Sequence, residues 1–319
     1  MNWLTGWKKI GIKVKQILKK QPTGKEESDW KNCPQCKKLS YLPDLMKNSY
    51  ICDCNFHFDL PPKLRLDSLF DSTYKIIDPP ENIEQDPLNF VVEEKYKYSD
   101  KIKKYKEITG QKTALVCASG NISNLSAVVV CFNPKFGAGR FGPAENEYFL
   151  KASDYAVQKK VDMWVVIYQS SGIDVHSGVT GLCGMTKSII AMDNIKKKNI
   201  PTYCVAARAT TGGVYASSFF MHDFIIVESK CVENLLFSGK RVTANILKGA
   251  DSIPDDFGTS LGVMKSGLVD IVLESRKELK ETITKLTNII LKKEKLEIQN
   301  QEEVHENQKD FGKTASTTS

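Results

Sequence analysis

The sequence predicts an α/β core in which strands alternate with helices. From residue 111 onward, apolar runs of strand length recur and are separated by amphipathic segments of helical length. Strand followed by helix, repeated in this way, is typical of a layered α/β fold. Hydrophobic residues make up 41% and charged residues 26% of the 319 residues. This composition is ordinary for a folded globular protein and excludes collagen-like and wholly disordered classes.

The expected core occupies residues 111–296. Its strands are the five apolar runs at residues 113–118, 125–132, 163–169, 202–207 and 224–228. Two helices are expected at 143–160 and 184–198, because apolar residues recur there at spacings of three and four and lysines fill the last turn, where cations suit the helix dipole. A last apolar helix, residues 274–296, precedes a polar tail, 297–319, which is expected to be disordered.

Three segments precede this core. Residues 1–29 form a basic arm followed by a linker rich in Pro, Gly, Ser and charge. Residues 30–58 form a small cysteine module. Residues 59–110 are charged, carry several prolines and few apolar runs, and predict a helical and irregular connector.

The basic arm allows two interpretations. The net charge of the chain is +7, and much of it lies in the arm, where apolar residues separate Lys8, Lys9, Lys13, Lys15, Lys19 and Lys20. The pattern fits a basic amphipathic helix on an anionic membrane or nucleic acid, and also a solvated arm that packs on its own protein or on a partner. The chain has no apolar signal core and no run long enough to span a membrane.

Cysteine usage suggests a reducing compartment. Four of the nine cysteines cluster in the small module, and the other five are scattered in apolar surroundings, which suggests reduced thiols. We therefore expect a cytosolic or organelle-matrix protein.

The small module has the spacing of a zinc ribbon. Cys33 and Cys36 form a CxxC knuckle, and Cys52 and Cys54 follow after fifteen residues, with His57 three residues further on. Two such pairs give a tetrahedral zinc ion two soft ligands each. The second pair is CxC, so Cys54 completes the site with either Cys52 or His57. A closed site of four ligands has no open position for substrate, and we expect its zinc to be structural.

Three glycine-bearing turns punctuate the core: FGAGRFG at residues 136–142, SSG at 170–172 and TTGGVYAS at 210–217. The second and third each follow an apolar strand. A turn of this kind points backbone N–H groups of a helix start at one place, and paired glycines let a substrate approach the main chain without meeting a Cβ. A developing oxyanion would benefit from such a site. Tight turns also need glycine for steric reasons alone.

Five landmarks in order give the chain a family resemblance. WKNCPQC, FGAGRFG, TTGGVYAS, FSGKRV at residues 237–242 and KSGLVDIVL at residues 265–273 resemble the successive motifs of acetyl-CoA carboxylase carboxyltransferase β subunits. The resemblance spans about residues 30–293. It implies a crotonase-like α/β fold, the ββα spiral core of the ClpP/crotonase type, with a small N-terminal zinc ribbon.

The resemblance also implies an activity. Members transfer a carboxyl group from carboxybiotin, held on a biotin carboxyl carrier protein, to acetyl-CoA, and the malonyl-CoA formed is the first committed intermediate of fatty acid biosynthesis. Gly212 and Gly213 match the glycine pair whose N–H groups stabilise the enolate oxyanion. The implied partners are the carboxyltransferase α subunit, in a heterotetramer of two α and two β subunits, and biotin carboxylase in an ATP-dependent complex. The implied location is the cytoplasm, or the plastid stroma if the protein is organellar.

The chain departs from the family pattern after the third expected strand. Family members usually carry SASGGARMQE, where this chain has QSSGIDVHSG: Gly172 is kept, Ile173 replaces the second glycine, and Val175 replaces the arginine. Because a β-branched residue tolerates positive φ poorly, we expect this turn to have lost part of its usual shape.

Several further residues are candidates for substrate binding or catalysis. Gly172, Gly139, Gly239 and Arg241 are expected to contact or shape the substrate site, with Lys240 and Arg241 as candidates for CoA phosphates or, equally, for a solvated basic pair or a subunit contact. His176 invites a general-base role, but no carboxylate partner is visible in the sequence, and we expect a surface or helix-start histidine. Ser170 and Ser171 are expected to form the turn, because no GxSxG motif is present.

Two rival functions remain open. One keeps the fold and changes the reaction, to a related acyl-CoA carboxyltransferase or a malonyl-thioester decarboxylase. The other is a zinc-ribbon, nucleic-acid-binding or regulatory protein on a catalytically silent crotonase scaffold, which Ile173 and the CxC pair suggest. The zinc ribbon is also basic, and the resemblance permits RNA binding through it as a secondary role. The glycine pair at Gly212 and Gly213 favours the enzyme.

Overall fold

The computed structural model describes residues 29–92, 96–246 and 253–292. The chain divides into two compact units between Cys54 and Asn55, each described here by itself. The basic arm, the linker and the polar tail lie outside the described residues, apart from Asp29. None of the described helices is long and apolar enough to span a membrane.

The smaller unit is a short antiparallel ribbon with one helix. Strand β1 (Trp30–Asn32) pairs with β2 (Leu39–Tyr41), and helix α2 (Leu42–Lys47) follows directly. The cysteine knuckle lies in the turn between the two strands, where the N–H of Cys33 donates to the carbonyl of Lys38. Residues 55–58, expected in this module, belong to the larger unit.

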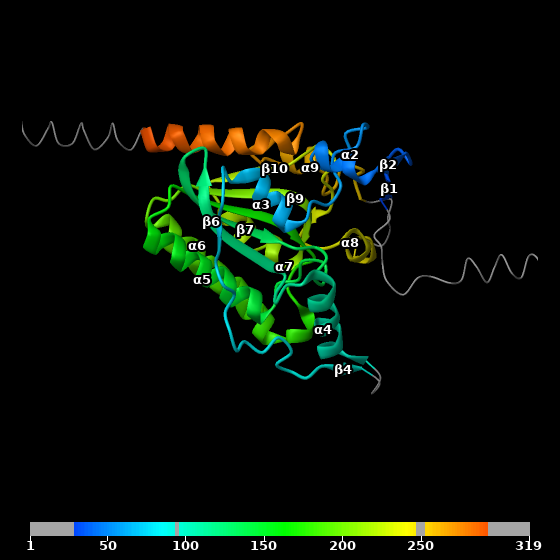
Figure 1. Cartoon of the computed structure of the whole chain (residues 1–319). Coiled ribbons are helices and arrows are strands. Elements are labelled where there is room, and N and C mark those ends of the chain that lie inside the picture. The colour runs from blue at the N-terminus through cyan, green and yellow to red at the C-terminus, as the bar shows by residue number, and fades with distance from the viewer. Residues whose placement is uncertain (1–28, 93–95, 247–252, 293–319) are drawn as a thin grey trace, which may run out of the picture. The chain divides into compact units, whose positions relative to one another are not determined.

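The larger unit is built on one mixed sheet (Figure 1). Its strand order is β12-β10-β9-β8-β7-β6-β3, with β11 paired to β9. The strands are β3 (Lys75–Ile76), β6 (Leu115–Ile122), β7 (Leu125–Phe132), β8 (Met163–Ser170), β9 (Thr202–Thr211), β10 (Phe224–Val227), β11 (Leu235–Leu236) and β12 (Ile271–Val272). Neighbours from β7 to β12 run parallel, and β6 pairs antiparallel with both β7 and β3. The five predicted strands and the α/β class are therefore confirmed.

Two long helices cover one face of the sheet (Figure 1). Helix α5 (Pro143–Lys159) begins with proline at its first position, and Glu145 accepts the N–H of Gly142 at 3.0 Å, which satisfies a donor at the helix start. Helix α6 (Val179–Lys196) begins five residues before the predicted start at 184.

The opposite face is covered by segments from both ends of the larger unit. Helix α3 (Pro62–Leu69) and the helical residues 279–292 pack against apolar side chains from the central strands. Buried Arg65 on α3 makes two hydrogen bonds to Glu228, at 2.6 and 3.1 Å. The predicted connector is thus an integral part of the core. The last predicted helix, 274–296, is seen as residues 279–292 after a short turn at Arg276–Glu278.

The remaining elements are short. They are β4 (Val91–Val92), β5 (Tyr96–Lys97), α4 (Tyr98–Thr109), α7 (Gly212–Tyr215), α8 (Lys240–Ile246), α9 (Ser260–Lys265) and the 3-10 turns η1 (Val175–Ser177) and η2 (Ser218–Met221). Helix α4 ends at Gly110, whose φ of +66° is the left-handed conformation that glycine adopts freely. Several of these short elements lie at the carboxyl ends of the parallel strands, where the site is formed.

Candidate functional site

The glycine turn after β9 presents a backbone donor, the N–H of Gly213, for which the described residues supply no acceptor. Gly212 has a φ of +64° and donates its N–H to the carbonyl of Phe237 at 3.0 Å. Among the described residues, none accepts the N–H of Gly213, which is the next group along α7. The predicted pair is therefore revised in this structure: Gly212 shapes and anchors the turn, and Gly213 offers the open N–H.

The three predicted glycine turns come together at the ends of β8 and β9. A Cβ on Gly172, whose φ is +103°, would lie 2.8 Å from the carbonyl oxygen of Thr211 and 3.3 Å from the Cα of Gly212. A Cβ on Gly139 would lie 1.9 Å from the carbonyl oxygen of Gln169. Only glycine allows these backbones to approach so closely, so Gly139 and Gly172 are needed for the packing of the turns.

Ser170 joins two of these turns. Its hydroxyl donates to the carbonyl of Gly139 at 2.6 Å and accepts the N–H of Gly172 at 3.1 Å. Both contacts use the hydroxyl within the frame of the site. Ser170 is thus a turn former, as expected.

Ile173 does not adopt the positive φ on which the expected change of the turn depended. The positive φ lies at Gly172, and Ile173 forms an isolated parallel bridge with Phe141. Its side chain lies against Gly213, where an added Cβ would meet Ile173 Cγ1 at 2.4 Å and Met185 Sδ at 3.0 Å. The β-branched residue causes no strain because the residue before it makes the turn.

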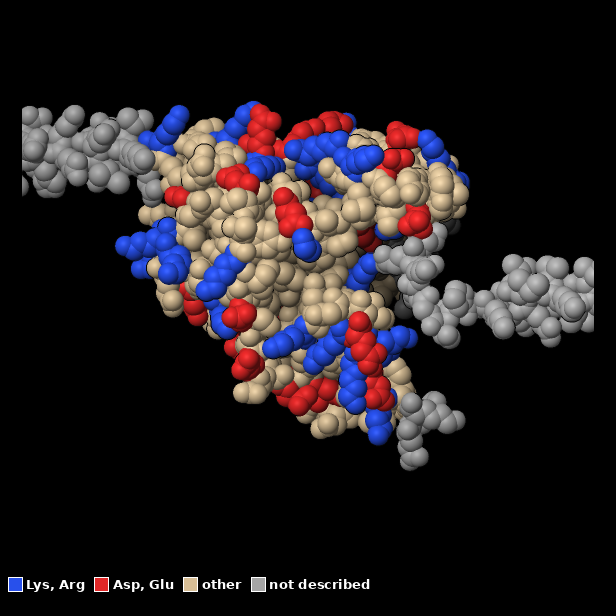
Figure 2. Space-filling model, viewed as in Figure 1, with Lys and Arg blue, Asp and Glu red and all other residues tan. Residues whose placement is uncertain are grey.

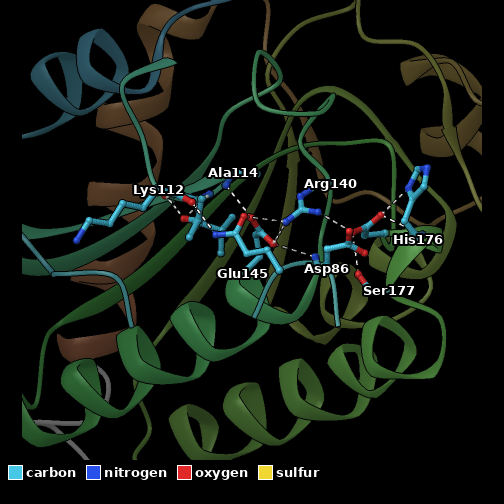
Figure 3. Close-up of polar contacts among 12 residues, drawn as sticks. Asp86, Lys112, Ala114, Arg140, Glu145, His176 and Ser177 are labelled. Carbon is cyan, nitrogen blue, oxygen red and sulfur yellow. Dashed lines mark hydrogen bonds and ion pairs between the residues drawn. The ribbon is translucent and has the colours of Figure 1, made fainter. Parts of the chain in front are cut away.

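A buried polar network supports this turn, and no pattern in the sequence indicates it. Asp174 Oδ2 accepts hydrogen bonds from Tyr98 at 2.8 Å, Arg140 at 2.6 Å and Ser177 at 2.7 Å. Tyr98 and Arg140 also contact each other. Figure 3 shows Arg140 between Glu145 on one side and the His176 and Ser177 region on the other.

The network extends from Arg140 to the start of the core. Arg140 lies 3.5 Å from Glu145 Oε2 and donates to Gln85 at 3.3 Å, and Glu145 accepts the N–H of Ala114 at 2.8 Å (Figure 3). The connector, the FGAGRFG turn, the start of α5 and the turn after β8 are therefore linked through one guanidinium.

Asp174 is held ionised. Burial by itself would raise its pKa, but the charge of Arg140 and the hydrogen bonds from Ser177, His176 and Tyr98 outweigh burial, so the pKa of Asp174 is lowered. Burial is also the main cause of the raised pKa of Tyr98. The pair therefore exists as a carboxylate and a neutral phenol.

His176 has the carboxylate partner that the sequence did not reveal. Its Nδ1 lies 3.0 Å from Asp174 Oδ1, and its ring stacks on Tyr98 with centroids 3.9 Å apart and planes 7° apart. The lack of a carboxylate partner in the sequence analysis is thus corrected, whereas the expected place at a helix start is confirmed, because His176 lies in the turn η1 that precedes α6. The signal was the Asp-x-His spacing, which places two side chains together only when a short turn, η1, follows Asp174.

An apolar cavity adjoins the Gly213 turn. It has a volume of about 490 Å³ and includes Tyr215 of α7 and Phe237, whose carbonyl anchors Gly212. Its walls come mainly from β11, from α9 and from the segment between them: Leu235, Leu236, Ser238, Thr243, Pro254, Asp256, Phe257, Gly258, Gly262, Val263, Ser266 and Leu268. Its size lies in the usual range for a small-molecule pocket.

The FSGKRV motif borders this cavity. Gly239 accepts the N–H groups of Val242 and Thr243 at the start of α8, and an added Cβ there would meet no atom within 4 Å. Arg241 and Lys240 lie in the first turn of α8, and their side chains are outside the described part of the structure. The role of Gly239 therefore lies in the geometry of the turn before α8, and close packing does not require a glycine there.

The four cysteines of the smaller unit gather into one cluster. Their sulfur atoms all lie within 4.8 Å of one another, with Cys33 and Cys54 at 3.6 Å and Cys36 and Cys52 at 3.7 Å. Four thiolates around a zinc ion with bonds of about 2.3 Å would stand about 3.8 Å apart. The cluster thus fits a tetrahedral metal ion, and the CxC spacing is no obstacle.

His57 has a different environment. It is 2% exposed, and Arg276 Nε lies 3.4 Å from its Nδ1. Burial, followed by the charge of Arg276, lowers its pKa to about 4. The same guanidinium lies 3.3 Å from Glu228. His57 therefore belongs to the buried ion-pair cluster of the larger unit, and the group of side chains that could hold a metal ion consists of the four cysteines.

Comparison with known proteins assigns the chain to a family. A profile described as the carboxyl transferase domain matches residues 88–316. The acetyl-coenzyme A carboxylase carboxyl transferase subunit beta of Pelagibacter ubique is 31% identical over 320 residues, which cover 99% of this chain and 100% of the relative. The protein of the same name from a Sulfurihydrogenibium species is 32% identical over 280 residues, 87% of this chain and 96% of the relative.

Solved structures confirm the crotonase-like carboxyltransferase fold. Transcarboxylase 12S superposes with a TM-score of 0.57 at 18% identity, over 72% of this chain and 41% of that chain. A Pseudomonas malonate decarboxylase hetero-tetramer gives a TM-score of 0.54 at 16% identity, over 73% of this chain and 82% of the matched chain. At these identities the likeness concerns the fold alone.

Proposed function

The chain belongs to the carboxyl transferase family as a β subunit of acetyl-CoA carboxylase, and from this we propose that it transfers a carboxyl group from carboxybiotin to acetyl-CoA in a site shared with an α subunit. The observation that carries the proposal is the open N–H of Gly213, at the junction of two touching glycine turns. Carboxyl transfer to a methyl carbon needs an enolate, and a fixed N–H donor stabilises its oxygen.

The residues around Gly213 have distinct roles in this proposal. The N–H of Gly213 donates to the thioester oxygen as negative charge develops there. Gly212 and Gly172 keep the two turns in contact, and Gly139 and Ser170 hold the turn after β8. Because these groups are fixed before the reaction, little reorganisation is needed in the transition state.

The apolar cavity beside α7 suits the thioester arm of CoA. Its volume of about 490 Å³ and its largely aliphatic and aromatic walls favour an uncharged, flexible chain. Gly239 opens the approach beside α8, and Arg241 is the candidate for the CoA phosphates. Biotin supplies the carboxyl group, and the carrier protein brings it to this site.

The exposed face of α6 is the proposed contact with the α subunit. Val179, Leu182 and Ile190 are 73%, 57% and 50% exposed, at helical spacing and beside the turn after β8. An apolar stripe of this kind marks a protein interface. We propose a heterotetramer of two α and two β subunits that acts with biotin carboxylase and the biotin carboxyl carrier protein.

The cysteine cluster is proposed to hold one structural zinc ion per chain. Sulfur separations of 3.6 and 3.7 Å suit tetrahedral ligation by four cysteines. Such an ion stabilises a unit that has only two three-residue strands and one short helix. The proposed location is the cytoplasm, or the plastid stroma for an organellar form.

Nucleic-acid binding through the zinc unit stays a secondary hypothesis. On the face seen in Figure 2, basic and acidic side chains of the described residues are intermingled. Lys38 pairs with Asp53 within the smaller unit, so part of its positive charge is already compensated. Salt-dependent RNA binding without partner-dependent turnover would favour this alternative over the enzyme.

The proposed reaction is tested by mixing the purified chain with its cognate α subunit, acetyl-CoA and carboxybiotin, and following malonyl-CoA. We expect formation only when both chains are present. A parallel incubation with malonyl-CoA alone tests the decarboxylase alternative. Loss of malonyl-CoA in that incubation, with no carboxyl transfer in the first, would reject the proposal.

A further inference from the structure

Helix α4 and the residues that flank it carry a dense basic surface. Residues 97–112 hold six lysines and two acidic residues, which give this short stretch +4 of the chain's net charge of +7. All six lysines are exposed. They are called here the α4 lysine surface: Lys97, Lys101, Lys103, Lys104, Lys106 and Lys112.

The spacing of apolar residues in α4 separates this surface from the core. Tyr98, Ile102 and Tyr105 are four and three residues apart, and residues at this spacing share one side of a helix. The first two are buried, and the ring of Tyr105 contacts Phe136 with centroids 5.5 Å apart. The lysines of α4 therefore occupy the rest of the helix circumference, in solvent.

The chain itself compensates little of this charge. Lys103 lies 3.7 Å from Asp100. Among the described residues, none supplies a carboxylate within 4.0 Å of Lys97, Lys104 or Lys106. Like charges three or four residues apart destabilise a helix, so carboxylates of a binding partner would relieve a repulsion that the described residues leave uncompensated.

Direct contacts connect α4 to the glycine turns of the site. Tyr105, which lies between two of the lysines in sequence, supports the FGAGRFG turn: a Cβ on Gly137 would lie 3.1 Å from its ring. The carbonyl of Gly139 in the same turn accepts the hydroxyl of Ser170 at 2.6 Å. The turn after β8 in its turn touches the glycine turn after β9. The α4 lysine surface is therefore held on the same frame as the proposed site.

A charged surface in this place suits a macromolecule that must reach the site and leave it again at every turnover. In the proposed reaction that macromolecule is the carrier of carboxybiotin. Attraction between opposite charges raises association rates by about 10- to 1,000-fold. Tighter apolar contact, by contrast, acts mostly by slowing dissociation. Lysines therefore favour fast arrival without slow release.

A nucleic acid is the other anionic candidate, and the composition of this surface suits it less. Residues 97–112 contain no arginine, the side chain that contacts phosphates and base edges through two parallel hydrogen bonds. Tyr98 is buried, Tyr105 supports the FGAGRFG turn, and Lys101 Nζ lies over the ring of Tyr96 at 4.7 Å. These rings are therefore not available to stack on bases, and an acidic protein is favoured.

We propose that the α4 lysine surface is the docking site of the biotin carboxyl carrier protein, which binds it through a face rich in Asp and Glu; this inference rests on the proposed function. The lysines contact the protein surface of the carrier and take no part in the transfer of the carboxyl group. Their effect is confined to association, so it depends on the carrier and on ionic strength.

The test compares two donors of the same carboxyl group, the carboxylated carrier protein and free carboxybiotin. Malonyl-CoA formation is measured with the assembled complex of this chain and its α subunit. Lys104→Glu combined with Lys106→Glu reverses charge on α4, and Lys104→Arg combined with Lys106→Arg keeps it. Glu and Arg have helix propensities close to that of Lys, and thermal unfolding checks that both double variants remain folded.

The matched control is Lys159→Glu combined with Lys198→Glu. Both lysines are exposed. Helix α5 begins directly after the FGAGRFG turn and ends 17 residues later at Lys159, about 25 Å along its axis (Figure 1). Lys198 follows the end of α6. The control thus makes the same change of charge at the other end of the long helices.

We expect charge reversal on α4 to lower kcat/KM for the carboxylated carrier by about 10-fold or more and to leave kcat/KM for free carboxybiotin unchanged. The arginine variant and the control should match wild type with both donors. Raising the ionic strength from about 0.01 to 0.15 M shortens the screening length from about 30 to about 8 Å. It should slow the use of the carrier by wild type and have little effect on the charge-reversed complex.

Several results would overturn the proposal. One is equal use of the carrier by wild type and the charge-reversed complex, and another is an equal loss in the control. Loss with both donors would place α4 in the site itself, and failure to assemble would place it in a subunit interface. Loss of binding to a single-stranded RNA with unchanged use of the carrier would favour a nucleic acid. A wild-type complex that forms malonyl-CoA from neither donor refutes the proposed function instead.

Discussion

The contact between Gly213 and Ile173 yields a quantitative prediction for Gly213→Ala. The backbone of Gly213 does not have a positive φ, so alanine is conformationally allowed there. The new Cβ would, however, lie 2.4 Å from Ile173 Cγ1 and 3.0 Å from Met185 Sδ. Relief of such an overlap costs about 1–3 kcal/mol and displaces α7 relative to the turn after β8.

This displacement should affect catalysis more than stability. Loss or misplacement of one oxyanion donor typically lowers kcat by about 100- to 1,000-fold. We therefore expect Gly213→Ala to assemble with the α subunit, to unfold at a moderately lower temperature, and to form malonyl-CoA at about one hundredth of the wild-type rate. The rate assay and thermal unfolding are run on the same preparations.

A second substitution provides the matched control. Ile173→Ala removes the closest contact of the new Cβ and leaves that with Met185 Sδ, so the double variant should recover part of the activity, with a coupling energy of about 1–3 kcal/mol. If Gly213→Ala were as active as wild type, or if the double variant showed no recovery, the steric reasoning and the assignment of the Gly213 N–H would both be wrong.

Three further outcomes follow from buried groups and from the metal cluster. Asp174→Ala should lower the free energy of unfolding by about 3 kcal/mol in chemical denaturation, because it removes the nearer carboxylate from buried Arg140 and leaves the charge of Glu145 at 3.5 Å; a change below about 1 kcal/mol would contradict the network. His57, with its pKa lowered from 6.5 to about 4, is neutral in the folded chain. Its contribution is complete above pH 6.5 and is lost as pH falls toward 4, by up to about 3 kcal/mol, and His57→Asn should flatten the pH dependence of the melting temperature in that window; an unchanged slope would contradict it. Chelation, or Cys36→Ser, should remove about one zinc per chain by metal analysis and expose residues 30–54 to protease, and an unchanged digestion pattern would argue against a structural metal.

The sequence predicted the core strands because burial on both sides of a parallel sheet leaves a plain signal. Strand β8 is buried at every residue. A nearly continuous apolar run of this length is typical of a strand that is covered on both faces of a parallel sheet. Helix α6 begins at Val179 and not at the predicted residue 184, and Gly181 lies in its first turn. In the fold it is a packing glycine, where a Cβ would lie 2.8 Å from the carbonyl oxygen of Asp174.

The three glycine turns could be predicted from the sequence, but the different roles of Gly212 and Gly213 could not. The resemblance to carboxyltransferase β subunits implied that Gly172 and Gly212 contribute to the expected site. Only the structure shows that the N–H of Gly212 is already bound to Phe237, 25 residues further on, and that no described residue accepts the N–H of Gly213. Backbone hydrogen bonding between distant loops leaves no pattern in a single sequence.

The buried polar network around Arg140 could not be predicted from the sequence for a related reason. Tyr98, Arg140 and Asp174 are 42 and 34 residues apart along the chain, and no periodicity links them. Each alone is an ordinary polar residue. A buried arginine needs a carboxylate partner, but which of the 38 acidic residues serves is decided by the fold.

The central claim is best tested by transfer of a labelled carboxyl group from carboxybiotin to acetyl-CoA while the α subunit is titrated against a fixed amount of this chain. The account predicts that labelled malonyl-CoA is absent with either chain alone, rises until the two chains are equimolar, and is abolished by Gly213→Val. Transfer by this chain alone, or full transfer in the Gly213→Val complex, would contradict it.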